Sequence, residues 1–258
     1  QGNCSKALQY HEKSLNMRIN IYGHTDHPDI ASSHHNMASA YYLQENYSKT
    51  LKHYEKSLNM QLSIYGHTDH PDIATSYNNI ASVYNSQGEY SKALQHHEKS
   101  LNMRLNIYGH TDHPDIAFSY NNMASVYRSQ GNYSKALQYH EKSLKMRLAV
   151  HQTAPHSDIF NSYLSLGDVS MSLFNFSSAV RYYQQSLCTL QLLSCDEKQL
   201  DSLRSMTDWS QPSITAGPVT TSNIDPLWLI HLYNMSICFI VYYFIPNMHH
   251  MVNVFQIL

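Results

Sequence analysis

Charged residues and cysteines are scarce in this chain. Asp, Glu, Lys and Arg make up only 14% of it, and the formal net charge is −2. A balance so close to neutral excludes the strongly basic surface with which proteins neutralise nucleic-acid phosphates, so we expect no nucleic-acid partner. The four cysteines (Cys4, Cys188, Cys195 and Cys238) form no CxxC pair. This spacing argues against a zinc ribbon or a disulfide framework and favours free thiols in a reducing compartment.

The motifs of common enzymes are missing as well. The sequence contains no glycine-rich phosphate loop, no GxSxG and no paired-carboxylate site. We therefore expect no enzyme, no catalytic residues and no cofactor. No signal peptide precedes Gln1, so we expect a cytoplasmic protein. Because the chain opens in the middle of a repeat, we also expect it to be a piece of a longer protein.

What the sequence does contain is a repeat of 43 residues. The segment YGHTDHPDIA occurs at 22–31, 65–74 and 108–117, and residues 65–107 and 108–150 differ at only eight positions. Residues 1–21 match the second half of a unit, and a degenerate copy continues in register after residue 150. We therefore predict a half-repeat followed by four repeats, the last of them worn. Their bounds are 1–21, 22–64, 65–107, 108–150 and 151–193.

Each repeat is predicted to form two helices. In the unit 65–107, Ile73, Tyr77, Ile80 and Tyr84 follow the helical period and place apolar side chains on one face. Gly88 interrupts this pattern, and a second periodic segment follows it. Proline and aspartate at 71–72 suit the first turn of a helix. Neither helix can bury its apolar side alone, so neighbouring repeats must stack.

Centred on Gly88, this spacing resembles the tetratricopeptide repeat. Tyr77, Ile80, Ala81 and Tyr84 take the packing positions that the family uses in its first helix. The longer period, together with HPDIA and SQGxYSKAL, is similar to the repeats of kinesin light chains and nephrocystins. The resemblance covers roughly residues 1–193. It implies an all-α fold, a right-handed superhelical solenoid of antiparallel helix pairs followed by a non-repeat C-terminal tail.

The resemblance also has departures. Glu45 and Phe174 stand where the repeat has its turn glycine. If that position requires a left-handed backbone, each costs about 1–2 kcal/mol. No heptads of the kinesin-light-chain coiled coil are present, so the resemblance does not identify a kinesin subunit.

The face of each first helix opposite its packing side is predicted to bind a partner, because in the resembled family this face lines a concave groove. The helical period of about 100° per residue assigns sixteen residues to this groove face. They are Ser32, His35, Ser39 and Tyr42; Thr75, Asn78, Ser82 and Asn85; Phe118, Asn121, Ser125 and Arg128; and Asn161, Leu164, Asp168 and Met171. Three asparagines, Asn36, Asn79 and Asn122, are predicted to lie at its edge.

Two of the eight differences between the near-identical repeats, Thr75/Phe118 and Asn85/Arg128, fall on this face. Drift on a solvated surface is one explanation, and alteration of a binding groove is the other. Asn78 and Asn121 could hydrogen-bond an extended peptide backbone. We therefore expect a protein partner, bound through an extended, neutral or mildly acidic segment. Its apolar anchors would lie near Phe118, Tyr42 and Leu164.

Histidines recur in the loops between repeats, as His24, His27 and Asp29 and their counterparts 43 and 86 residues later. Such a set could ligate zinc. Each lies in a loop without a third histidine or a cysteine, and Pro and Asp already have helix-start roles, so we expect no metal. The helical histidines His11, His53, His97 and His140 are predicted to be structural and partly buried.

Beyond residue 193 the repeat pattern ends. We predict a linker over 194–226 and an apolar tail over 227–258. Within this tail, 227–245 is an apolar run about long enough to cross a bilayer. Neither Lys, Arg nor Glu occurs after Arg204. Three interpretations stay open: a tail anchor in an intracellular membrane, facing the cytosol; a helix packed on the last repeat; or a non-native end.

Taken together, the sequence predicts a scaffold or adaptor that binds another protein. The alternatives are an adaptor tethered to a membrane through 227–245 and a structural spacer within a larger multidomain protein. The sequence does not identify the partner.

Overall fold

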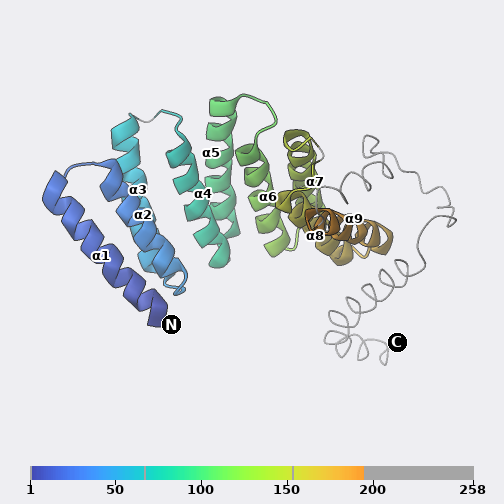
Figure 1. Ribbon diagram of the computed structural model, residues 1–258, viewed down its shortest axis with the longest axis horizontal. Helices are drawn as coiled ribbons and strands as arrows, with labels where there is room; N and C mark the ends of the chain where they lie inside the picture. Colours follow the sequence, from blue (N-terminus) through green and yellow to red (C-terminus); the bar gives the residue numbers. More distant parts are fainter. Residues whose placement is uncertain (1, 67, 153, 195–258) are drawn as a thin grey trace. The chain divides into compact units, whose positions relative to one another are not determined.

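The computed structural model describes residues 2–66, 68–152 and 154–194, which form nine α-helices and no strand. The helices stand side by side in chain order (Figure 1). Helices that are consecutive in the chain contact each other, and α4 also contacts α6. The helices are α1 (Gly2–Tyr22), α2 (Pro28–Tyr42), α3 (Tyr47–Tyr65), α4 (Pro71–Ser86), α5 (Tyr90–Tyr108), α6 (Pro114–Ser129), α7 (Tyr133–Val150), α8 (Ser157–Ser172) and α9 (Phe176–Ser194).

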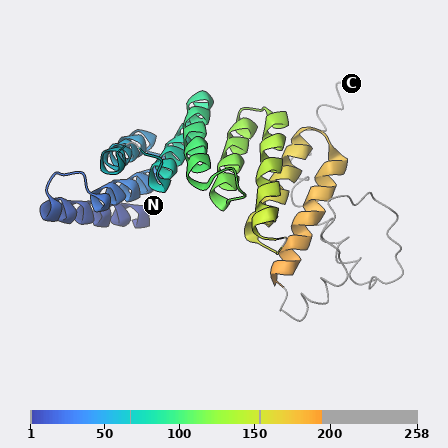
Figure 2. The same ribbon diagram turned by 90° about the horizontal axis from the view of Figure 1, so that it is seen from above.

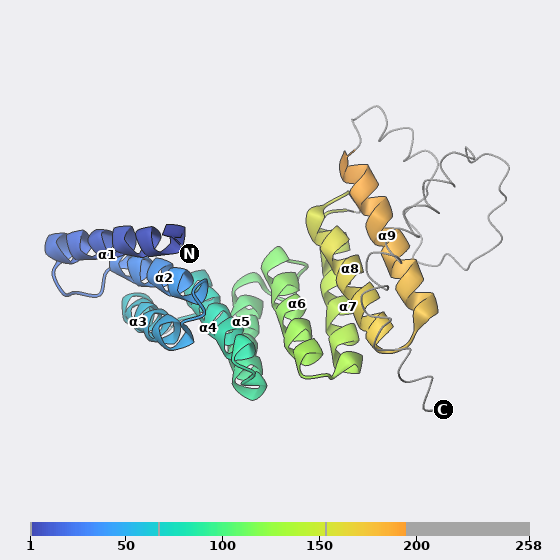
Figure 3. The same cartoon turned by 90° about the horizontal axis from the view of Figure 1, so that it is seen from below.

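The helices form antiparallel pairs, α2 with α3, α4 with α5, α6 with α7 and α8 with α9 (Figures 2 and 3). The first helix of each pair begins at residue 28, 71, 114 or 157, a constant step of 43 residues. Helix α1 has the place of a second helix. The predicted all-α solenoid of helix pairs is therefore confirmed.

The start of each first helix is fixed by a histidine. His27, His70, His113 and His156 are the N-caps, and the Nδ1 atom of each accepts the backbone N–H two residues later at 3.1–3.2 Å. A proline follows the cap of α2, α4 and α6, and an aspartate lies in the first turn of all four helices. The histidine accepts one of the unpaired N–H groups of the first turn, proline has no N–H group, and the aspartate charge is favourable at a helix N-terminus. The helix-start roles that the sequence predicted for Pro and Asp agree with this arrangement.

The turn within each pair requires a left-handed residue. Gly88 and Gly131 have φ values of 76° and 79°. Glu45 and Phe174, which replace glycine there, both have a φ of 57°. The condition on which the sequence predicted a cost is therefore met, because residues with a Cβ rarely adopt this left-handed region.

The core runs continuously from pair to pair. One cluster joins Ala38 of α2 and Leu58 of α3 to Ile73, Ile80 and Val83 of α4. Ile73, Ile80 and Val83 are at most 1% exposed. The apolar side of each first helix is thus buried between its own partner and the preceding pair, as the stacking argument predicted.

In the part of the chain that the structure describes, no helix is both long and apolar enough to cross a membrane. Apart from Ser194, the predicted linker (194–226) and the apolar tail (227–258) lie outside the described residues. The candidate span 227–245 therefore stays a prediction.

Candidate functional site

Fifteen of the sixteen predicted groove-face residues keep exposed surface on α2, α4, α6 and α8. Those that are largely exposed are Ser32, Thr75, Phe118, Arg128, Asn161 and Asp168. Those of intermediate exposure are His35, Ser39, Tyr42, Ser82, Asn85, Asn121, Ser125, Leu164 and Met171. The edge residue Asn36 is exposed, whereas Asn79 and Asn122 are half-buried.

Asn78 is the exception, and the expectation that its amide is open to a ligand is wrong. It is 4% exposed, and its Oδ1 accepts a hydrogen bond from Nδ2 of Asn122 at 2.8 Å. Helices α4 and α6 contact each other directly, and this bond joins them. The amide of Asn78 therefore stabilises the stack, because a buried amide needs a partner inside the protein.

The amide of Asn121 is also engaged. Its Oδ1 lies 3.1 Å from Nδ1 of His140 on the second helix of the same pair. His140 is 2% exposed, and burial lowers its pKa to about 4. The ring is therefore neutral at pH 7, and this contact requires a proton on Nδ1. Asn121 keeps partial exposure.

The two charged groove-face residues lie next to each other. An Nη1 atom of Arg128 on α6 is 3.7 Å from Oδ2 of Asp168 on α8, and both side chains are about half exposed. The other carboxylate oxygen of Asp168 accepts the hydroxyl of Tyr183 at 2.8 Å. This ion pair neutralises the charge of the face between the last two pairs.

Serine hydroxyls recur along the face. The Oγ atoms of Ser82 and Ser125 each donate to the backbone carbonyl four residues earlier at 3.1 Å. Their protons are used, while their lone pairs remain available as acceptors. Phe118, which is 43% exposed, contributes apolar surface beside them.

We call the contact between a second helix and the first helix of the following pair a junction. At three of the four described junctions, an arginine joins the two helices. Nη1 of Arg104 on α5 donates to the carbonyl of Asp115 at 2.9 Å and to Oγ of Ser119 at 2.7 Å. Burial lowers the pKa of this guanidinium, and the nearby Asp115 partly offsets the effect. Arg18 and Arg147 make the same two contacts at their own junctions, with Asp29 and Ser33 and with Asp158 and Ser162.

The junction between α3 and α4 differs, because Gln61 stands at the arginine position. Ser76 donates to Oε1 of Gln61 at 2.6 Å. A hollow of about 310 Å³ opens beside Gln61, and we call it the junction pocket. Its lining includes Gln61, Asp72 and the predicted residues Ser32, His35, Asn36 and Thr75. The structure thus brings four predicted residues from two helices to one concave site.

Gln61 was not predicted from the sequence as a site residue. The signal was present, because Met60-Gln61 aligns with Met17-Arg18, Met103-Arg104 and Met146-Arg147. The two most similar repeats, 65–107 and 108–150, both have arginine at this position, so the differences between them do not point to Gln61. A second hollow, of about 470 Å³, lies at the turn of residues 130–134 against Leu173. It contains none of the predicted residues and no charged side chain.

The histidines that cap the first helices also make ring contacts that stabilise the loops. The rings of His27, His70 and His113 stack on the tyrosine that ends the preceding helix, as in Tyr65 with His70 and Tyr108 with His113. The ring centroids are 3.5–3.6 Å apart in these pairs. Capping uses Nδ1, and stacking fixes the ring plane. These contacts explain, without a metal, why the capping histidine and the aspartate two residues after it recur in every repeat.

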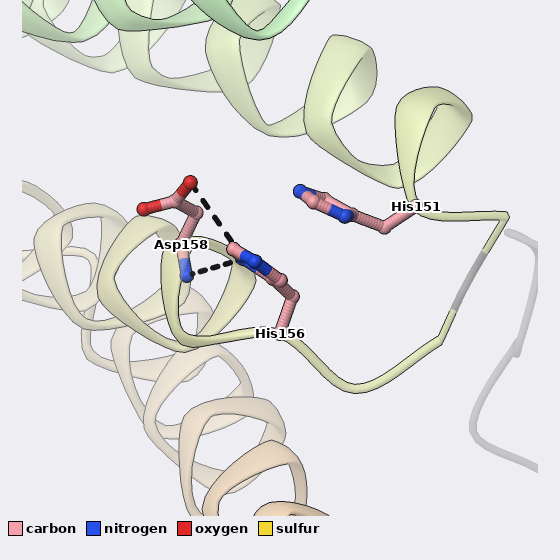
Figure 4. Close-up of side chains that lie close together, drawn as sticks. All are labelled: His151, His156 and Asp158. Atoms are coloured by element: carbon pink, nitrogen blue, oxygen red, sulfur yellow. Dashed lines mark hydrogen bonds and ion pairs between the residues drawn. The ribbon is translucent and has the colours of Figure 1, made fainter.

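One set of potential metal ligands does come together among the described residues: His151, His156 and Asp158 (Figure 4). Their ligand atoms lie within 4.8 Å of one another. The two rings are stacked, 3.7 Å apart and 14° from parallel, and Nδ1 of His156 accepts the N–H of Asp158. A metal binds in the plane of an imidazole ring, and two nearly parallel planes at this separation cannot share one ion. The group is a capped helix start in which His151 replaces the usual tyrosine.

Comparison with known proteins gives a consistent result. The family model described as Tetratricopeptide repeat matches residues 1–63, 29–106 and 72–149. No curated protein sequence matches the chain.

Several solved structures are similar. BtubC (BKLC) from P. vanneervenii is 20% identical with a TM-score of 0.65, and the match covers 76% of each chain. A putative kinesin light chain with nearly identical repeats, from Podosopora anserina, is 18% identical with a TM-score of 0.61, over 73% of this chain and 87% of that one. A Rap protein complexed with competence and sporulation factor is 17% identical with a TM-score of 0.61, over 80% of this chain and 54% of that one. At these identities the similarity concerns the fold.

Proposed function

Because the chain belongs to the tetratricopeptide repeat family, we propose that it is a non-catalytic interaction scaffold that binds an extended segment of a partner protein along the groove face. The observation that carries this proposal is the solvent exposure of that face, which the packing of the helices does not require. Fifteen of its sixteen side chains stay exposed or partly exposed, while residues on the other side of the same helices, such as Ile73 and Ile116, are fully buried. This exposed surface, which the packing of the solenoid does not use, supports a binding role for the face.

The chemistry of the face supports an extended and largely uncharged segment. Arg128 and Asp168 compensate each other, so this part of the face has little net attraction for a charged tail. The acceptor lone pairs of Ser82 and Ser125 suit backbone N–H groups. Phe118 offers a ring for an apolar side chain, and exposed aromatic residues often provide binding energy at interfaces. The proposal is supported by the similarity in fold to a Rap protein that is complexed with competence and sporulation factor.

The test is a peptide array probed with the full chain, followed by affinity measurements on the peptides retained. We expect Phe118→Ala to weaken binding by about tenfold or more, because it removes an exposed aromatic contact. A matched variant on an outer helix surface, Glu98→Ala, should bind as the parent does. A structural spacer would retain no peptide. An array that retrieved only free acidic C-terminal tails would contradict the proposed groove.

A further inference from the structure

The junction pocket exists because two side chains of this junction are shorter than their counterparts 43 residues later. Gln61 stands in place of Arg104, and Thr75 stands in place of Phe118. At the later junction the guanidinium of Arg104 lies 5.8 Å from the ring centre of Phe118, and the arginine is only 5% exposed. The arginine and the aromatic ring together occupy that junction. With both missing, the equivalent space is the hollow of about 310 Å³.

The groups that bind the arginine elsewhere are still present at this junction. Asp72 and Ser76 occupy the positions of Asp115 and Ser119, which accept hydrogen bonds from Arg104. Here the Ser76 hydroxyl donates to Oε1 of Gln61. The junction keeps the helix carbonyl and the serine oxygen, although Ser76 is fully buried against Gln61 and does not line the hollow, and Gln61, which does line it, adds an amide oxygen. The junction lacks the cation that these oxygens bind at the other three junctions.

The charge of the lining has the matching sign. Asp72 is the carboxylate of the pocket, and its Oδ2 accepts the hydroxyl of Tyr65 at 2.9 Å. Neither Lys nor Arg lines the hollow. Burial lowers the pKa of His35, so its ring is neutral at pH 7. The pocket thus has a net negative charge and an excess of acceptors, which favours a cationic donor.

We propose that the junction pocket binds an arginine side chain of the partner segment, whose guanidinium lies against Asp72 and the amide oxygen of Gln61. This assignment rests on the proposed function, because it identifies one anchoring side chain of the bound segment. A guanidinium fits better than an ammonium, since its planar fork carries five N–H donors, whereas at the next junction Nη1 of Arg104 alone already serves both Asp115 and Ser119. The rest of the segment stays largely uncharged along the groove face.

The experiment uses the full chain, isotopically labelled and observed by NMR, with acetyl-Gly-Arg-Gly-amide as the probe. Saturable shifts are expected at the amides of Asp72 and Ser76. Gln61→Arg supplies the missing cation from within the chain, and the probe should then bind at least tenfold more weakly. The matched control is Gln95→Arg, which adds the same charge at an exposed position of α5.

A gain of a site tests the same idea independently. The double variant Arg104→Gln/Phe118→Thr copies the pocket into the α5–α6 junction, and probe-dependent shifts should then appear at Asp115 and Ser119. The inference is overturned if the parent chain shows no saturable shift at Asp72 and Ser76, or if Gln61→Arg leaves binding unchanged. Equal binding of acetyl-Gly-Lys-Gly-amide would overturn the assignment to arginine.

These outcomes are separable from those of the peptide array. If the array retains peptides that need Phe118 but have no required basic residue, the scaffold function stands and the arginine pocket fails. If the tripeptide binds at Asp72 and Ser76 while the array retains nothing, the pocket's affinity for arginine stands, but the proposed function fails and with it the assignment to a partner segment.

Discussion

Nδ2 of Asn122 donates to Oδ1 of Asn78 at 2.8 Å, and this bond connects the first helices of two neighbouring pairs. Asn78 is almost completely buried, so the bond replaces contacts that its amide would otherwise make with water. The two residues are 44 positions apart in the sequence, and the pairing depends on the register of one repeat against the next.

Asn122→Ala should therefore destabilise the fold although it removes no apolar contact of the core. We expect a loss of about 1–3 kcal/mol in the free energy of unfolding, because Oδ1 of Asn78 would stay buried without a donor. Urea denaturation followed by circular dichroism measures this, with the exposed Asn36→Ala as the matched control. Equal stability of the two variants would show that water can replace the bond.

Removal of a junction arginine should cost more than removal of a surface charge. Arg104→Gln eliminates two charge-assisted hydrogen bonds at a buried position, and about 1.5–3 kcal/mol is expected to be lost. Gln61→Arg should raise the melting temperature, since Asp72 and Ser76 offer the same acceptors. Calorimetry on both variants tests this pair of opposite effects. A melting temperature lowered by Gln61→Arg would show that the pocket does not admit the side chain.

The buried histidines should make stability depend on pH. His97 and His140 are both 2% exposed, and burial lowers the pKa of each to about 4. An unfolded histidine titrates near 6.5, so between these values the unfolded chain binds more protons. Their contribution is complete above pH 6.5 and is lost as pH falls towards 4. The loss is on the order of 2–3 kcal/mol for each histidine.

The matched variants for this prediction come from the chain itself. The repeat position of His97 and His140 is occupied by tyrosine in two other repeats, as Tyr54 and Tyr183. The double variant His97→Tyr/His140→Tyr should flatten the pH dependence of urea midpoints between 6.5 and 4, whereas the exposed His110→Tyr should not. An unchanged slope in the double variant would mean that other groups, such as His34, dominate.

Replacing Glu45 or Phe174 by glycine should stabilise the fold, because both residues have a left-handed backbone. Glu45→Gly and Phe174→Gly place glycine where φ is 57°, and each should stabilise the fold by about 1 kcal/mol. Glu45→Ala shortens the side chain but keeps the Cβ, so it should give no such gain. Thermal denaturation of the three variants separates backbone strain from side-chain effects, and a gain with alanine equal to that with glycine would contradict it.

The capping histidines should have a measurable effect on helix stability. His113→Ala removes the acceptor for the N–H of Asp115 and the stacking on Tyr108, and about 0.5–2 kcal/mol should be lost. His113→Asn keeps an acceptor at the N-cap and should recover part of the loss. If asparagine and alanine destabilise equally, the ring stacking rather than the cap is the main contribution.

The sequence by itself determined the features that depend on neighbours along the chain. The step of 43 residues, the two helices of each repeat, the Pro and Asp at helix starts and the left-handed turn at Glu45 all follow from local geometry. Periodicity also separated the buried Ile73 and Ile80 from most of the groove face, because a helix turns by a fixed angle per residue.

Only the tertiary structure decided which side chains of that face are free. Asn78 has the period of a surface residue, yet it is buried because Asn122 of the next pair packs against it. Gln61 and Thr75 lie on different helices, and the hollow between them appears only when those helices are placed side by side. Helical period describes one helix, whereas burial and pockets depend on what the neighbouring helix brings to the same place.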